Sequence, residues 1–215
     1  MKTDRLELNG PEQEHIGSRS ALYSLISKGF RFPAPEQFES VKTGRFADAV
    51  AEALAHLPYD GLKGGELGRG TALSFDEFQG RYIQLFEVGG ELGAPCFLYE
   101  AEYGGGRMKV MEEVLRFYHH FGLRLSQEKR DRPDHLASEL EFMHVLTFRE
   151  AEALLQGNER RAYLSAQRDF LRFHLSDFLA TVASKVGASG VPFYADLASL
   201  AAAFCQRELS HVQPA

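Results

Sequence analysis

Three Glu-x-x-His pairs are the residues of this 215-residue chain whose spacing could bind a metal. They are Glu12 with His15, Glu141 with His144, and Glu208 with His211. Pairs of this spacing on facing helices build di-iron sites in helical bundles. Three pairs are only a mild excess over chance for this composition, and two of them lie near the chain ends. A helical di-iron oxidase using Glu141 and His144 is therefore the alternative function, and the favoured interpretation has no metal.

The other sequence signals for catalysis are incomplete. No G-x-S-x-G motif marks a serine nucleophile, and Cys96 and Cys205 lie far apart without a CxxC pair or a histidine-bearing motif. The glycines at 104–106 precede an expected helix, but no GK[ST] follows them, so a turn is favoured over an anion site. We therefore expect no catalytic residues, no cofactor and two reduced thiols.

The segment Pro133-Asp134-His135 has the composition of a helix start. Proline is tolerated in the first helical turn, and aspartate favours the N-cap, where its carboxylate accepts free amide protons. From this local pattern alone, Asp134 is a cap and His135 a solvated residue of the first turn. Glu139 and Glu141 are expected off the apolar stripe, which consists of Leu136, Leu140, Met143, Thr147 and Ala151.

Helical periodicity recurs along the rest of the chain, and strand alternation is nearly absent. Ser74 and Glu77 form a capping box. The helix that it opens carries an apolar side made of Phe78, Tyr82, Leu85 and Phe86. Further helices are expected over 16–28, 45–57, 110–121, 171–186 and 197–204, with loops at 33–35, 63–70 and 87–106.

These patterns predict an all-α fold, a bundle of about eight helices in two closely packed parts joined by a hinge. The polar run from Ser126 to Arg132 is the candidate linker. We expect a loose N-terminal segment (1–15), an N-terminal helical part (16–125), a hinge (126–135) and a C-terminal helical part (136–215).

Charge and hydropathy narrow the classes of partner. The formal net charge of −6 disfavours nucleic acid and anionic membranes and favours a partner that carries arginines. No run of about 18 apolar residues could span a membrane, and the first ten residues contain acids and no apolar run. We therefore expect a cytoplasmic protein.

The segment Pro133 to Leu136, followed by Glu-Leu-Glu-Phe-Met, resembles the hinge and next helix of the TorD/DmsD/NarJ family of redox-enzyme maturation chaperones. Three further segments resemble that family in the same order along the chain. They are Ala21 to Leu25 with Phe30 and Pro33; Tyr82, Leu85, Phe86, Pro95, Glu100 and Tyr103; and Phe170, Leu171, His174 and Leu175.

The chain also departs from the family pattern. Ala101 stands where the family commonly has serine, and Phe178 stands where a tryptophan is frequent. The branch serving type II enzymes of the dimethyl sulfoxide reductase family and the nitrate reductase branch both remain open as the source of the client.

The resemblance implies an all-helical, non-enzymatic cytoplasmic chaperone, either a monomer or a lobe-exchanged dimer. Its partner would be the apo catalytic subunit of a molybdenum enzyme, bound through its N-terminal, twin-arginine leader. A carboxylate beside an aromatic ring in the glycine-rich segment suits the arginines of such a leader. The client-binding residues would be Pro133, Asp134, His135, Glu100, Tyr103, Tyr82 and Phe86, beside a hinge helix with Leu136, Glu139, Phe142 and Met143.

Overall fold

The computed structural model describes residues 10–88, 93–125, 132–187 and 190–212. Its elements are α1 (Pro11–Gly29), α2 (Pro35–Lys42), α3 (Arg45–Ala55), α4 (Phe75–Phe86), the 3₁₀ turn η1 (Glu100–Glu102), α5 (Arg107–His120), α6 (Leu136–Leu155), α7 (Arg161–Phe170), the π-helical turn η2 (Leu171–Leu175), α8 (Ser176–Gly187) and α9 (Pro192–His211). Helices α7 and α8 are joined through η2 without a break, so the described residues form eight continuous helices. The predicted all-α class is confirmed.

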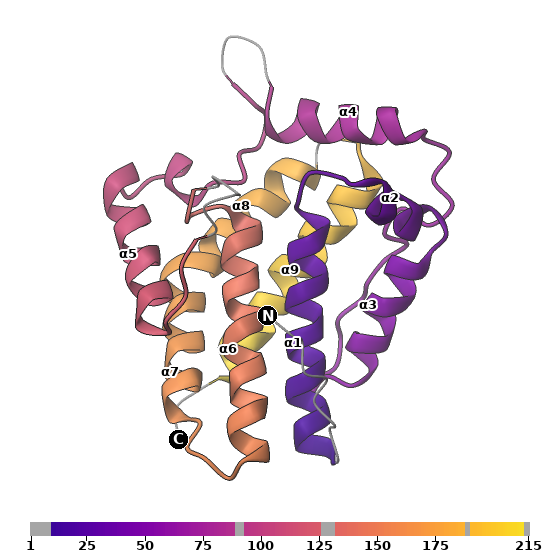
Figure 1. The fold of residues 1–215 in the computed structure, drawn as a ribbon. Helices are drawn as coiled ribbons and strands as arrows, with labels where there is room; N and C mark the ends of the chain where they lie inside the picture. The colour runs from indigo at the N-terminus through magenta and orange to yellow at the C-terminus, as the bar shows by residue number, and fades with distance from the viewer. Residues whose placement is uncertain (1–9, 89–92, 126–131, 188–189, 213–215) are drawn as a thin grey trace.

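The long helices α1 and α6 pack side by side through the middle of the bundle (Figure 1). Helix α7 packs on α6, α8 packs on α9, and α3 lies against the other side of α1. Helix α4 crosses the upper end of the bundle, and α5 lies at its outer edge. None of the described helices has the length and apolar composition that a bilayer crossing requires.

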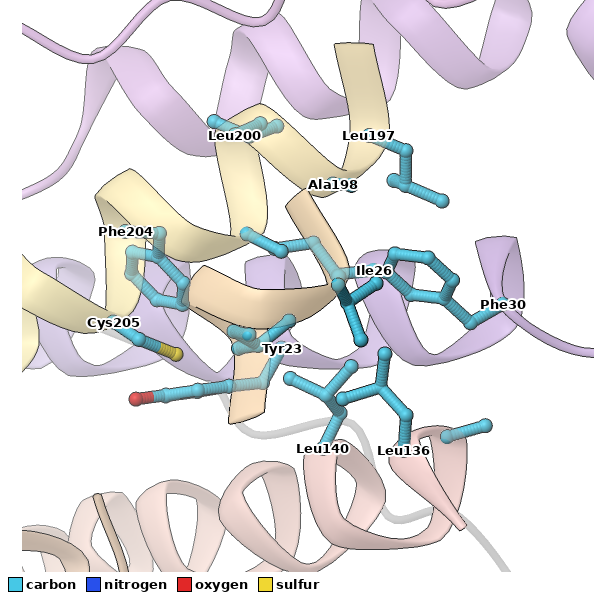
Figure 2. Close-up of a cluster of buried hydrophobic side chains, with 14 of the residues drawn as sticks. Tyr23, Ile26, Phe30, Leu136, Leu140, Leu197, Ala198, Leu200, Phe204 and Cys205 are labelled. Atoms are coloured by element: carbon cyan, nitrogen blue, oxygen red, sulfur yellow. The ribbon is translucent and has the colours of Figure 1, made fainter. Parts of the chain in front are cut away.

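A single buried cluster joins residues from both predicted parts of the chain, from Leu22 to Val212. Figure 2 shows its centre, where side chains of α1, α6 and α9 meet: Tyr23, Ile26, Phe30, Leu136, Leu140, Leu197, Ala198, Leu200, Phe204 and Cys205. Burying a large apolar side chain contributes about 1.5–3 kcal/mol, so this shared core stabilises the two predicted parts together. Residues 126–131 of the predicted hinge lie outside the described residues, and the division into parts stays a prediction.

Two helix starts differ from the sequence expectation. Helix α1 begins at Pro11, so residues 11–15 are helical, whereas 1–15 was expected to be loose. Pro35 begins α2, although a loop was expected there. Proline suits the first helical position because its missing amide hydrogen has no partner there in any case. The capping box is confirmed, since the Ser74 hydroxyl accepts from the Glu77 amide and the Glu77 carboxylate accepts from the Ser74 amide.

A charged cluster that no sequence motif marks lies inside the bundle. Arg19 of α1, with 1% of its surface exposed, donates to Glu208 of α9 at 2.8 Å, to Glu150 of α6 at 3.1 Å and to Gln167 of α7 at 2.6 Å. Burial acts to lower the pKa of Arg19, but the charges of Glu208 and Glu150 raise it above its ordinary value. Arg19 therefore stays charged and fixes four helices relative to one another.

Candidate functional site

The N-terminus of α6 is capped by His135, which corrects the expectation that Asp134 is the cap. The His135 ring nitrogen Nδ1 accepts a hydrogen bond from the Ala137 amide at 3.1 Å. The ring packs edge-on against Tyr99 with 5.1 Å between centroids, and only 8% of His135 is exposed. His135 is therefore not the solvated residue that the local pattern suggests.

Asp134 instead joins two segments that are distant in sequence. Its carboxylate is fully buried and accepts from the Ala101 amide at 3.1 Å. The Asp134 carbonyl accepts from the Glu100 amide at 3.0 Å, and the Leu98 carbonyl accepts from the Leu136 amide at 2.8 Å. Segment 98–101 is thereby fixed along the start of α6. We call residues 98–103 together with 132–136 the Asp134 corner.

Glu100 and Tyr103 are the two other predicted client-binding residues in this corner. They lie in and beside the short turn η1, within a segment that was expected to be irregular. Glu100 Oε2 lies 3.0 Å from Nδ1 of His174 on η2. The Tyr103 hydroxyl donates to the Phe97 carbonyl and accepts from the Phe97 amide, both at 2.8 Å. Both side chains therefore hold the corner in place while remaining partly exposed.

Tyr82 and Phe86, also predicted to contact a client, lie in the core of α4 with 3% of each exposed. The Tyr82 hydroxyl donates to the Phe30 carbonyl at 3.2 Å. The Tyr82 ring supports Phe32, which packs edge-on against it at 5.4 Å and has 47% of its surface exposed. The exposed aromatic residue in this region is thus Phe32, which the sequence analysis did not single out.

The hinge helix holds one buried acid, Glu139, that was expected to lie off the apolar stripe. Glu139 has no exposed surface, and neither of its carboxyl oxygens has a hydrogen-bond partner among the described residues. Burial raises the pKa of Glu139 well above its ordinary value, and the negative charges of Glu100 and Asp134 raise it further. The other named positions of this helix, Leu136, Phe142 and Met143, are core residues.

Arg132 completes the corner, and the sequence analysis did not single it out as a functional residue. Its Nε and one terminal nitrogen donate to the two oxygens of Asp134 at 3.0 and 2.6 Å. The other terminal nitrogen donates to Glu102 at 2.7 Å, and the guanidinium lies 4.5 Å from the centre of the Tyr99 ring. The hydrogen bond from Arg132 lowers the pKa of Glu102. The one feature of the sequence that could have indicated this role is the position of Arg132 directly before the Pro133-Asp134 pair.

The Glu-x-x-His residues do not converge. His144 makes hydrogen bonds with Ser20, Glu141 pairs with Arg31, and Glu208 pairs with Arg19. Within the described part of the chain, no group of three or more His, Cys, Asp or Glu residues is placed to hold a metal ion.

Comparison with known proteins identifies the family. The family described as the nitrate reductase delta subunit matches residues 43–184, which include α4, η1, the Asp134 corner and α6. This chain belongs to that family. The perchlorate reductase assembly chaperone protein of Dechloromonas aromatica is 31% identical over 203 residues, covering 91% of this chain and 90% of the relative.

Other relatives of this nitrate reductase delta subunit family member carry similar names. The chlorate reductase assembly chaperone protein of Ideonella dechloratans is 38% identical over 136 residues, 62% of this chain and 67% of the relative. A redox enzyme maturation protein from Archaeoglobus fulgidus has the same fold, with a TM-score of 0.55 and 19% identity over 94% of this chain and 99% of that one. The predicted family is confirmed. Its named relatives are assembly chaperones and not catalysts, which argues against a di-iron oxidase.

Proposed function

We propose that this protein is a cytoplasmic assembly chaperone for the apo catalytic subunit of a molybdopterin enzyme of the dimethyl sulfoxide reductase superfamily. The observation that carries the proposal is the match along nine-tenths of the chain to a reductase assembly chaperone. In this proposal the chain holds the N-terminal leader of the subunit. The subunit is thereby kept from export and degradation until its molybdenum cofactor and iron–sulfur cluster are inserted.

The chemistry of the Asp134 corner supports a basic ligand. Glu100 and Glu102 are partly exposed carboxylates in η1, and the ring of the preceding Tyr99 lies 4.5 Å from the guanidinium of Arg132, which Glu102 binds. Carboxylates bind guanidinium groups through paired, charge-assisted hydrogen bonds, and aromatic faces attract the same cation. The twin arginines of a leader would therefore bind at this corner, where Asp134, His135 and Tyr103 hold the carboxylates in place.

Phe32 supports a second contact, with the apolar stretch that follows the arginines of a leader. Its ring is nearly half exposed and rests on Tyr82. An exposed aromatic ring held by a buried neighbour presents apolar surface at a small cost in conformational entropy. In this proposal Tyr82 and Phe86 support the contact and do not touch the client.

Copurification tests the proposal. The chain is coexpressed with the apo catalytic subunit of the molybdenum enzyme from the source organism, as the parent or as Glu102→Gln. Glu36→Gln, on the exposed first turn of α2, is the matched control. We expect the parent and the control to retain the subunit and Glu102→Gln to retain less. Failure of the parent to retain it, or stoichiometric iron in the purified protein, would contradict the proposal.

A further inference from the structure

The guanidinium of Arg132 is bound by its own chain in the manner that the proposed function assigns to a client arginine. Asp134 accepts two hydrogen bonds from it and Glu102 accepts a third, at 2.6 to 3.0 Å. The Tyr99 ring lies 4.5 Å from its central carbon. All three guanidinium nitrogens of Arg132 donate hydrogen bonds. The planar, forked guanidinium of arginine suits such paired hydrogen bonds, whereas the ammonium of lysine is a compact point charge.

We propose that Asp134, Glu102 and Tyr99 form a guanidinium-binding cradle that Arg132 occupies in the free chaperone, and that an arginine of the client displaces Arg132. The inference rests on the proposed function for the identity of the client. It adds the residues that bind one client guanidinium and an autoinhibitory contact that the client must displace.

The cradle is held by contacts that do not involve Arg132. The Ala101 amide orients the Asp134 carboxylate, and the Glu100 amide binds the Asp134 carbonyl. The Tyr118 hydroxyl donates to the Pro133 carbonyl at 2.9 Å. These bonds position Asp134 whether or not the guanidinium is present, so the site keeps its shape when Arg132 leaves.

Arg132, which occupies the cradle, is accessible to solvent, whereas Asp134 at the bottom of the cradle is not. A quarter of the Arg132 side chain is exposed, together with 23% of the Glu102 side chain, while the Asp134 side chain has no exposed surface. A competing arginine would therefore enter where Arg132 leaves. Displacement exchanges one guanidinium for another, so the buried carboxylate of Asp134 is not left without a counter-charge.

Chemical rescue tests the cradle without any client. Melting temperatures of the parent, Arg132→Ala and Arg107→Ala are compared in methylguanidinium and in methylammonium at equal ionic strength. Arg107 is the matched control because it pairs with Glu102 but is bound by neither Asp134 nor Tyr99 in the described structure. Methylguanidinium should raise the melting temperature of Arg132→Ala by about 2 °C or more and leave the other two unchanged. The cradle would be overturned if methylammonium raised the melting temperature of Arg132→Ala equally, or if methylguanidinium raised that of Arg107→Ala equally.

Titration with a leader peptide tests the displacement. A peptide with two adjacent arginines before an apolar stretch should bind Arg132→Ala about tenfold more tightly than the parent, because no internal group competes. The version with two lysines should show no such gain. If Arg132→Ala does not fold, Arg132→Lys serves, since it keeps the charge but loses the fork. Unchanged or weaker binding of the arginine peptide would overturn the autoinhibition.

The two proposals can fail separately. If the parent does not retain the catalytic subunit but methylguanidinium rescues Arg132→Ala, the cradle stands and the proposed function falls. If the subunit is retained but the rescue fails, the proposed function stands and the cradle falls.

Discussion

His174 and Glu100 bind one another across the two halves of the sequence, with 3.0 Å between Nδ1 and Oε2. The contact joins the π-helical turn η2 to the 3₁₀ turn η1. A π-helical turn inserts an extra residue and shifts the side chains that follow it. In η2, Leu171, His174 and Leu175 are buried, while Arg172 and Phe173 face solvent.

His174→Phe should destabilise the protein by about 1.5–3 kcal/mol, the contribution of a hydrogen bond to a charged group. Phenylalanine keeps a ring against Phe117 and Phe170 but gives Glu100 no donor. Urea denaturation measures the change. Phe173→Ala is the control, because that side chain is 63% exposed and its loss should alter the free energy of unfolding by at most about 0.5 kcal/mol. Equal effects of the two substitutions would contradict the assigned role of His174.

Arg19→Met should destabilise the protein by about 3–5 kcal/mol, because Glu208 and Glu150 would be buried without their guanidinium partner. Thermal and chemical unfolding measure this loss. Arg116→Met is the control, because Arg116 is 77% exposed and lies 3.7 Å from Glu112. Its effect should stay within about 1 kcal/mol. A small effect at Arg19 would show that the charged cluster does not hold the helices together.

Glu139→Gln should change the pH dependence of stability. Because the pKa of Glu139 is raised in the folded chain, the folded state retains a proton that the unfolded state releases above its ordinary pKa of 4.5. Stability therefore falls as pH rises from about 5 toward the folded-state pKa, by up to about 1.4 kcal/mol per pH unit.

Glutamine stays neutral, so its free energy of unfolding should lack that part of the slope between pH 5 and 8. Glu36→Gln, which removes an exposed carboxylate, should retain the parent slope. If parent and Glu139→Gln have the same slope, Glu139 is ionised in the folded protein.

Tyr103→Phe should cost about 0.5–1.5 kcal/mol of stability, because its hydroxyl makes two hydrogen bonds with the Phe97 backbone. The ring would keep its contact with Phe178, 5.7 Å between centroids. Binding of a twin-arginine peptide should therefore be retained in Tyr103→Phe and reduced in Tyr103→Ala. Urea unfolding and fluorescence titration of labelled peptide give the two quantities. Loss of peptide binding in Tyr103→Phe would instead indicate that the Tyr103 hydroxyl binds the client.

Helical periodicity and capping patterns predicted much of the helical framework. They failed where a segment distant in sequence supplies the hydrogen-bond partners of a residue. The capping box at Ser74 follows from spacing alone, because both partners lie within four residues. The role of Asp134 does not follow from spacing, because the local pattern indicated a helix cap at this residue. In the folded chain its carboxylate meets the Ala101 amide, 33 residues away, and His135 takes the capping position.

The structure brings some residues of the predicted site together, and their role in client binding stays a prediction. The Pro133-Asp134-His135 motif lies in the Asp134 corner, and so do Glu100 and Tyr103. The motif did not indicate that Arg132 fills the corner.

By itself, the sequence determined the all-helical class, many of the helix positions and the family, because periodicity, caps and motifs are properties of neighbouring residues. Only the tertiary structure decided which polar residues are buried. A helical pattern shows which residues share a face, but not which other segment will cover that face. Glu139 and Arg19 occupy positions that look solvated in sequence, and they are buried because the segments packed around them exclude water.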